Sequence, residues 1–273
     1  MTSDPTPEPR GSTAPDPEGI ELSIVLATLN ERANLPELVR RIRAQPLPSY
    51  EILIVDDGST DGTREYVHEL SKEDGRVRLL SHEGRQTTLR AQSQGIEEAR
   101  GSAIAILDAD LQHPPEVLPA LLGELKAGAA LAVASRYAPG GSAGPRTAFR
   151  WTISRGAEWL TKALLPPARG VADPVSGFFA FRREIWSPLN PLYRGYKLLI
   201  FVLVMAEGRP IREVPFRFTP RTEGASKVTG SGAFFRVFVT ELILARRFRT
   251  RVGARAGTAA SSGPSLSTVM LLL

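Results

Sequence analysis

Short apolar segments that alternate with helix-like segments constrain the fold of this chain more than any other feature. The apolar segments have the length and the Val, Ile and Leu content of buried strands, and they are residues 21–28, 50–55, 76–80, 103–107 and 129–135. The segments between them have helical patterns, and some open with a capping residue or a proline. Strands that alternate with helices form a mostly parallel sheet with helices on both faces. The first half therefore predicts an α/β fold.

The second half and the two ends have other patterns. We expect helices at 149–165, 197–206 and 234–248 and strands at 178–182 and 211–218. Residues 1–19 hold five prolines, four acidic residues and one basic residue, which predicts a disordered tail that is not a signal peptide. Residues 249–273 are expected to form a flexible tail, so the folded part is 20–248.

Composition narrows the classes of function. The chain has no cysteine, which excludes disulfides, zinc ribbons, iron–sulfur clusters and thiol nucleophiles. Its net charge is +5, and the part after the acidic N-terminal tail carries +8. This excess predicts an anionic partner, which can be a nucleic acid, a nucleotide, a phospholipid or an anionic substrate. The apolar runs are shorter than the roughly 20 residues that a membrane span needs.

Acidic residues follow two of the predicted strands. Asp56 and Asp57 end one strand, and Asp108 and Asp110 follow another, with Gln112 close by. Ligands of open α/β sheets bind outside the carboxyl ends of the strands. Two carboxylates and an amide oxygen suit Mg²⁺ or Mn²⁺ together with phosphate oxygens. The alternative is that these acids only cap the following helices.

Other nucleotide and catalytic motifs are missing or accidental. The sequence contains neither a G-x-x-x-x-G-K-[ST] phosphate loop nor a G-x-G-x-x-G after the first strand. Residues 140–144 spell G-x-S-x-G, but they lie in a loop rather than in the strand–turn–helix context of a nucleophilic serine.

Seven motifs in a fixed order resemble a known family. They are LATLNE (26–31), VDDGSTDG (55–62), LDADLQHP (107–114), SRY (135–137), SRGA (154–157), SGFFAF (176–181) and GASK (224–227). Over about residues 21–248 the chain resembles the family 2 GT-A glycosyltransferases, and within them the dolichol/polyprenyl-phosphate mannosyltransferase group. The resemblance implies a GT-A fold with a nucleotide-sugar half (20–137) and a smaller acceptor half (138–248).

The resemblance also implies roles for individual residues. Contacts to the nucleotide sugar fall on Ala27, Leu29, Glu31, Val55, Asp57, Asp108, Ala109, Asp110, Arg136, Arg221 and Lys227. Asp57 is preferred over Asp56 for the base or ribose. The metal ligands are Asp108, Asp110 and Gln112, and the acceptor side is assigned to Arg150 and Ser154. The alternative for any single arginine is a solvated surface charge.

The implied reaction is inverting transfer of a hexosyl group, with mannose from GDP-mannose as the first choice, to a polyprenyl or dolichyl monophosphate. Asp110 and Arg221 would act at the diphosphate. A lipid phosphate needs no general base, whereas a sugar hydroxyl does. Asp173 is the carboxylate we nominate for that role, with capping of its turn as the alternative. UDP-glucose or another nucleotide sugar and a hydroxyl acceptor remain open.

Three departures from the family pattern concern the donor site. Ala27 stands where the family usually has proline, and Leu29 where it usually has tyrosine. Residues 84–90 (GRQTTLR) replace a glycine-rich turn. We expect backbone contacts to the nucleotide to survive these changes, while donor preference or acceptor shape can differ.

The basic C-terminal half suggests where the enzyme works. Residues 234–248 combine an apolar face with flanking arginines, which is typical of a helix in an anionic membrane interface, although simple packing on the core is the alternative. We therefore expect a cytoplasmic enzyme that is peripheral on the cytoplasmic membrane face, held directly or through a separate membrane subunit. Nucleic acid is not an expected partner. Two non-enzymatic alternatives are a polyanion-binding module and a scaffold protein.

Overall fold

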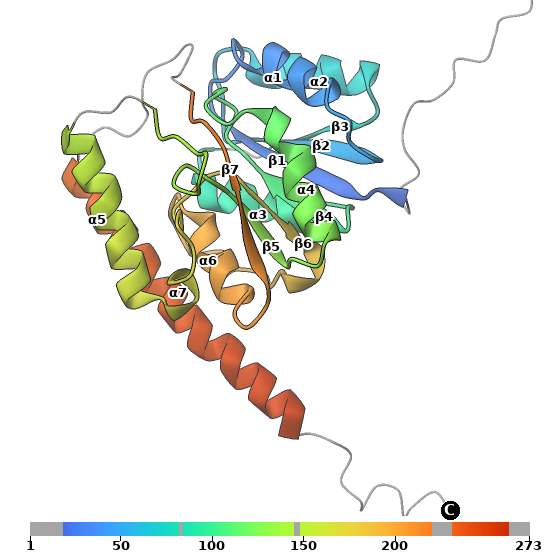
Figure 1. Ribbon diagram of the computed structural model, residues 1–273. Coiled ribbons are helices and arrows are strands. Elements are labelled where there is room, and N and C mark those ends of the chain that lie inside the picture. The colour runs from blue at the N-terminus through green and yellow to red at the C-terminus, as the bar shows by residue number, and fades with distance from the viewer. Residues whose placement is uncertain (1–18, 82–83, 145–147, 220–230, 262–273) are drawn as a thin grey trace, which may run out of the picture.

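The computed structural model describes residues 19–81, 84–144, 148–219 and 231–261. Its centre is a seven-stranded sheet with the order β3-β2-β1-β4-β6-β5-β7 (Figure 1). The strands are β1 (Leu22–Thr28), β2 (Tyr50–Asp56), β3 (Val77–Ser81), β4 (Ala103–Ile106), β5 (Leu131–Ser135), β6 (Phe179–Arg182) and β7 (Ile211–Pro215). Only β6 runs against its neighbours in this sheet, so the predicted mostly parallel α/β architecture is confirmed.

Helices cover both faces of the sheet, as the nearly continuous apolar strands require. The helices of the described residues are α1 (Leu35–Arg43), α2 (Thr63–Glu73), α3 (Thr88–Glu98), α4 (Leu118–Lys126), α5 (Ala148–Leu164), α6 (Leu198–Met205) and α7 (Ser231–Ser261), and of these α5 and α7 lie away from the sheet. Alternate residues of one strand enter two different apolar clusters. Val25 belongs to the cluster that contains α3 and α6, whereas Ile24 belongs to the cluster that contains α1 and α4.

The strand order creates the place where a ligand can bind. From β1 the chain moves outward through β2 to β3 and then returns to place β4 on the other side of β1. Such a reversal leaves a crevice at the carboxyl ends of the two central strands. In register, Thr28 at the end of β1 lies beside Asp56 at the end of β2. The acidic residues after β2 and β4 therefore flank the end of β1.

The C-terminal helix differs from its predicted length. We expected a helix at 234–248 followed by a flexible tail from 249, but α7 continues to Ser261, so this part of the prediction is corrected. An ion pair between Arg249 Nη2 and Glu207 Oε1 at 2.6 Å fastens the helix just past that boundary. Six of the twelve residues 250–261 are Ala or Arg, which have high helix propensity.

One stripe of α7 is part of the core. Phe238, Leu242, Ala245 and Phe248 are buried in the cluster that contains α6. The alternative of packing on the core therefore holds for this stripe, while Ile243 is 46% exposed on the same helix. Among the described residues, no helix is long and apolar enough to cross a membrane.

Candidate active site at the carboxyl edge of the sheet

Four of the predicted site residues follow three strands that end at one edge of the sheet. Asp57 follows β2, Asp108 and Asp110 follow β4, and Arg136 follows β5. Because β6 is antiparallel to both β4 and β5, the residues just before β6 reach the same edge. Each step across one intervening strand is about 10 Å. The edge thus has the length of a nucleotide sugar, with Asp57 at one end and Arg136 at the other.

The end of β2 separates the roles of two neighbouring aspartates. Asp56 is fully buried, and its Oδ2 lies 3.2 Å from the N–H of Ser59 and 3.4 Å from Arg64. Asp57 Oδ1 accepts the backbone N–H of Gln86 at 2.6 Å. No described residue donates a hydrogen bond to Asp57 Oδ2. Asp56 Oδ1 also has no hydrogen-bond partner, but it is fully buried, so the arrangement agrees with the preference for Asp57 as the ligand-binding member of the pair.

The segment that departs from the family pattern lies against Asp57. The N–H of Gln86 donates to Asp57 Oδ1. Gly84 lies against Gly58, in the loop that follows Asp57, because a Cβ on Gly58 would lie 3.7 Å from the Gly84 carbonyl carbon. Oε1 of Gln86 is buried without a hydrogen-bond partner. The altered residues 84–90 are thus part of the wall around Asp57.

The remaining predicted nucleotide contacts surround the ends of β1 and β2. Ala27 and Leu29 are half-buried, and Glu31 is buried with its Oε2 accepting Asn34 Nδ2 at 2.7 Å. The Val55 side chain lies in the apolar core and is fully buried. Any contact of Val55 with a ligand would therefore use its backbone.

The turn after β4 is built on an unusual backbone. Leu111 has a φ of 63°, a left-handed conformation that costs a non-glycine residue about 1–3 kcal/mol. Thr219 Oγ1 donates to the Leu111 carbonyl at 3.0 Å, and the N–H of Gln112 donates to Asp110 Oδ1 at 3.1 Å. These bonds hold the turn that carries Asp108 and Asp110 at the carboxyl end of β4.

His113 also supports this turn. Its Nδ1 accepts the N–H of Asp108 at 3.1 Å and lies 3.4 Å from Asp108 Oδ2, and its ring packs among Phe178, Phe216 and Phe218. Burial lowers the pKa of His113, so it is a neutral acceptor near pH 7. The side chain of Asp108 is 46% exposed, whereas Asp110 is buried.

The donor set fits a hard divalent cation that keeps part of its coordination for a ligand. No group of three or more His, Cys, Asp or Glu side chains suited to a metal occurs among the described residues. The site instead offers the Asp108 and Asp110 carboxylates, and the amide of Gln112 lies at the rim with its Nε2 3.4 Å from the Thr219 carbonyl. Mg²⁺ characteristically takes one or two carboxylates plus substrate phosphates. The residues present therefore suit Mg²⁺ or Mn²⁺ bound together with a diphosphate.

Asp173 forms a closed ion pair with Arg136. Nε and Nη2 of Arg136 each lie 2.7 Å from an oxygen of Asp173, and the Arg136 N–H donates to the same carboxylate at 3.1 Å. Asp173 is fully buried, and Glu213 accepts its backbone N–H at 3.1 Å. Since both carboxylate oxygens bind Arg136, this geometry favours a positioning role for Asp173 over the nominated role of a general base.

Lys197 is a candidate site residue that the sequence patterns did not single out. It immediately precedes α6, and its Nζ donates to the Val175 carbonyl at 3.1 Å. Val175 lies in the same turn before β6 that holds Asp173. The electrostatic neighbours of Lys197 include Arg136 and Asp108.

The match to a family model decides the classification. Residues 23–187 match the model of glycosyl transferase family 2. The chain belongs to this family. The membership confirms the predicted resemblance and the prediction of a glycosyltransferase.

Curated relatives of this family 2 chain are named as enzymes that attach mannose to a dolichol or polyprenol phosphate. A dolichol-phosphate mannosyltransferase of Pyrococcus furiosus is 40% identical over 79% of this chain, which covers 61% of that enzyme. The enzyme of the same name from Saccharomyces cerevisiae is 34% identical over 77% of the chain and 82% of its own length. A polyprenol monophosphomannose synthase of Mycolicibacterium smegmatis is 35% identical over 78% and 84%, respectively.

Solved structures establish the fold of the family 2 chain. Glucosyl-3-phosphoglycerate synthase of Mycobacterium tuberculosis, in a complex with Mn²⁺, UDP-glucose and phosphoglyceric acid, superposes with a TM-score of 0.63. It is 24% identical and covers 84% of this chain and 80% of its own. The GT-A type of α/β fold that the motifs implied is thus confirmed.

The remaining predicted contact residues of the family 2 chain are Ala109, Arg150, Ser154, Arg221 and Lys227. Arg221 and Lys227 lie outside the described residues. Arg150 is in α5, but its side chain is outside the described part of the structure. Ser154 is half-buried on α5, and Ala109 is buried in the apolar cluster beneath the turn after β4. The assignments of these residues stay predictions.

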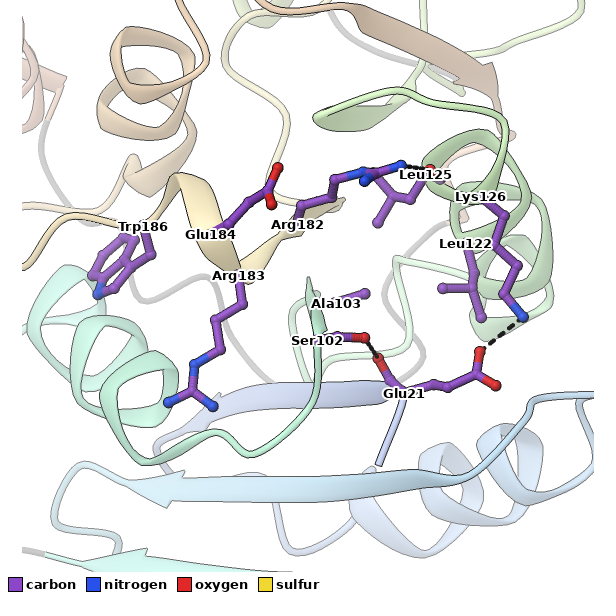
Figure 2. A pocket seen from close by; sticks show the side chains of 10 residues that line it. All are labelled: Glu21, Ser102, Ala103, Leu122, Leu125, Lys126, Arg182, Arg183, Glu184 and Trp186. Carbon is purple, nitrogen blue, oxygen red and sulfur yellow. Dashed lines mark hydrogen bonds and ion pairs between the residues drawn. The ribbon is translucent and has the colours of Figure 1, made fainter. Parts of the chain in front are cut away.

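A large pocket lies at the opposite edge of the sheet. It has a volume of about 680 Å³ and is lined near the start of β4 and the end of β6, with an ion pair between Lys126 and Glu21 at 2.8 Å across one side (Figure 2). None of the predicted site residues lines it. The pocket is therefore separate from the candidate active site.

Proposed function

We propose that this chain transfers a hexosyl group, mannose from GDP-mannose, to a polyprenyl monophosphate with inversion at the sugar carbon. The observation that carries the proposal is the row formed by Asp57, the Asp108/Asp110 pair and Arg136 along one sheet edge. This row offers a nucleoside contact, a cation site and a phosphate contact in the order that a nucleotide sugar and an anionic acceptor need. The names of the curated relatives support the choice of sugar and lipid.

The metal site would be formed by the turn after β4. Asp108 and Asp110 would hold Mg²⁺ or Mn²⁺, with the Gln112 amide oxygen beside them. When bound, the ion would supply positive charge that stabilises the negative charge growing on the leaving diphosphate. The backbone of this turn, held by His113 and Thr219, fixes the two carboxylates in advance.

The chain's own residues would then arrange the two substrates. Asp57 would bind the base or ribose, and the guanidinium of Arg136, whose orientation Asp173 fixes, would bind a phosphate. An oxygen of the acceptor phosphate attacks the sugar C1 from the face opposite the diphosphate. The C1–O bond to the diphosphate breaks, and its electron pair leaves with the nucleoside diphosphate. The acceptor oxygen is already anionic near pH 7, so no general base is needed.

The donor and acceptor can be tested in one assay. The purified chain is incubated with Mn²⁺ or Mg²⁺, polyprenyl phosphate and radiolabelled GDP-mannose or UDP-glucose, and the lipid-extractable label is counted. We expect label from GDP-mannose at a rate at least about tenfold above UDP-glucose, since a base-specific site typically discriminates by 1.4 kcal/mol or more. Polyprenol without the phosphate is the matched control and should remain unlabelled.

Two results of this assay would contradict the proposal. Transfer only to a soluble hydroxyl acceptor would support a different family 2 reaction, and higher activity with UDP-glucose would replace the donor. Residues 84–90 depart from the family pattern and contact Asp57 through Gln86, so the preference for GDP-mannose over UDP-glucose is the part of the proposal that this assay tests most closely. Absence of transfer from any donor would leave a binding or scaffold role.

We further propose that α5 and α7 contact an anionic membrane surface. The two helices lie side by side away from the sheet (Figure 1). Of the large apolar side chains that are exposed among the described residues, most are on these two helices: Trp151, Ile153, Trp159, Phe235 and Ile243. Exposed Arg246 and Arg247 border an apolar groove of about 330 Å³ between the helices. Aromatic and aliphatic side chains beside arginines are typical of helices at an anionic lipid interface.

A charge placed on this surface should weaken membrane binding. We expect the double variant Trp159→Asp and Ile243→Asp to bind anionic vesicles at least about tenfold more weakly in a flotation assay, because two apolar anchors are replaced by acids. His68→Asp, at an exposed position of α2, adds an acid away from α5 and α7 and should bind like the wild type. Wild-type protein that ignores anionic vesicles at low salt would refute direct membrane contact.

A further inference from the structure

Lys197 is a half-buried cation whose ammonium forms no ion pair with a described carboxylate, although acids lie nearby. It caps α6, whose eight residues are all buried, and its ammonium has one acceptor, the Val175 carbonyl. Within the described residues it forms no ion pair. A lysine that is largely withdrawn from water is usually paired with an acid, because an unpaired charge is costly there. The position of Lys197 therefore calls for an anion that a ligand would bring.

The acids near Lys197 are engaged by other groups. Asp173 binds Arg136 through both oxygens, and Glu241 accepts backbone N–H groups. Asp108 is one of the two carboxylates that would hold the metal ion. Burial lowers the pKa of Lys197, and the nearby Arg136 lowers it further. An arriving phosphate would offset both effects.

The turn before β6 holds Lys197 near Arg136 and Asp108, which belong to the proposed reaction centre. Asp173, at the start of this turn, holds Arg136, and the Val175 carbonyl holds Lys197. Gly177, at its end, leaves room for the metal site, since a Cβ there would lie 3.0 Å from Asp108 Oδ2. One short turn thus gathers the Arg136 guanidinium, the Lys197 ammonium and the Asp108 carboxylate.

The backbone of Lys197 is fixed from α7. Glu241 Oε1 accepts the N–H of Tyr196 at 2.5 Å and the N–H of Lys197 at 2.8 Å. Only glycine fits at 195, because a Cβ there would overlap the Glu241 carboxylate. Glu241 therefore caps the N-terminus of α6 from a distant helix and orients the residue that begins it.

We propose that Lys197 is a substrate-binding residue whose ammonium binds a phosphate at the reaction centre, with Glu241 as its positioning residue. The inference rests on the proposed function and deepens it. The phosphate can belong to the diphosphate of the donor or to the acceptor, since the recognition chemistry is the same. The two sources predict different binding defects.

Binding measurements on Lys197→Met distinguish the two sources. Titration calorimetry is carried out with GDP plus Mn²⁺ and, separately, with a short-chain polyprenyl phosphate. We expect the Kd of one of the two to rise about 10- to 100-fold, as for loss of one hydrogen bond to a charged group. A rise for GDP assigns Lys197 to the donor, and a rise for the lipid phosphate assigns it to the acceptor. Lys197→Arg should recover part of the affinity because it keeps the charge.

The matched control is Lys126→Met, which removes one charge at the opposite edge of the sheet and should leave both affinities unchanged. Unchanged affinity for both ligands in a folded Lys197→Met protein would overturn the inference. This outcome is distinct from failure of the proposed function, because binding is read without turnover and transfer is scored on the wild type.

Glu241 has its own test. Glu241→Gln keeps an acceptor oxygen and should keep the affected Kd within about threefold, whereas Glu241→Leu should raise it about tenfold by releasing two N–H groups. The same Kd should not respond to Glu241→Leu when Lys197 is already Met. An additive effect in that double variant would show that Glu241 acts on the fold alone and would overturn its positioning role.

Discussion

Asp110→Asn should lower the rate of sugar transfer by about 10²- to 10³-fold while the protein stays folded. The substitution keeps the shape of the side chain and the oxygen that accepts the Gln112 N–H at 3.1 Å. It removes one of the two negative charges that would hold the divalent ion, and stabilisation of a leaving group by such an ion amounts to several kcal/mol. The transfer rate is measured with labelled donor across a titration of Mn²⁺.

The Mn²⁺ titration distinguishes weakened metal binding from a general loss of activity. The variant should recover part of its rate at high Mn²⁺ concentration, because the remaining Asp108 still binds the ion weakly. Glu65→Gln, an exposed carboxylate on α2, removes the same charge elsewhere and should behave like the wild type. A variant at Asp110 that transfers sugar at the wild-type rate would contradict an active site built on the turn after β4.

Asp173→Ala should destabilise the protein by about 3–5 kcal/mol and abolish most of its activity. The substitution leaves the Arg136 guanidinium, which is 13% exposed, without its carboxylate partner, and breaking a buried ion pair from one side costs this much. The free energy of unfolding is measured by denaturant titration. The double variant Asp173→Ala and Arg136→Met should recover most of the stability, because neither charge remains to be buried.

The same position separates a positioning role from a general base. A positioning role predicts that Asp173→Asn, which is less disruptive, keeps the pH dependence of the wild type at a reduced rate. If Asp173 accepted a proton from the acceptor, the variant would lose the rising acidic limb of the profile. A stability loss below about 1 kcal/mol together with a changed pH profile would restore the general-base interpretation.

Local patterns in the sequence predicted the elements that carry the site. The strands came from short β-branched runs, and the parallel order brought Asp57, Asp108 and Asp110 to one edge, because residues that end parallel strands lie together whatever their separation in the chain. The predicted choice of Asp57 over Asp56 agrees with the contacts of the two carboxylates.

Contacts between distant segments could not be predicted in this way. Lys197 meets Val175 across 22 residues, and Asp173 meets Arg136 across 37. In the sequence alone, Lys197 looks like any polar residue that precedes an apolar helix, because its contact with Val175 is not visible there. Glu241 lies in an amphipathic pattern that is typical of a surface helix and of a packed helix alike. Its partners, the backbone N–H groups of Tyr196 and Lys197, are known only from the structure. Arg249 of α7 likewise pairs with a distant residue, Glu207.

The chemical structure of the product tests the central claim most directly. Wild-type protein is incubated with GDP-mannose, whose sugar is α-linked, a polyprenyl phosphate and Mn²⁺, and the purified lipid product is analysed by mass spectrometry and NMR. We predict a mannosyl phosphate joined to the polyprenyl chain through a β-anomeric carbon, because attack from the face opposite the diphosphate inverts the donor. An α-linked product, or mannose attached to anything other than the lipid phosphate, would contradict the proposed reaction.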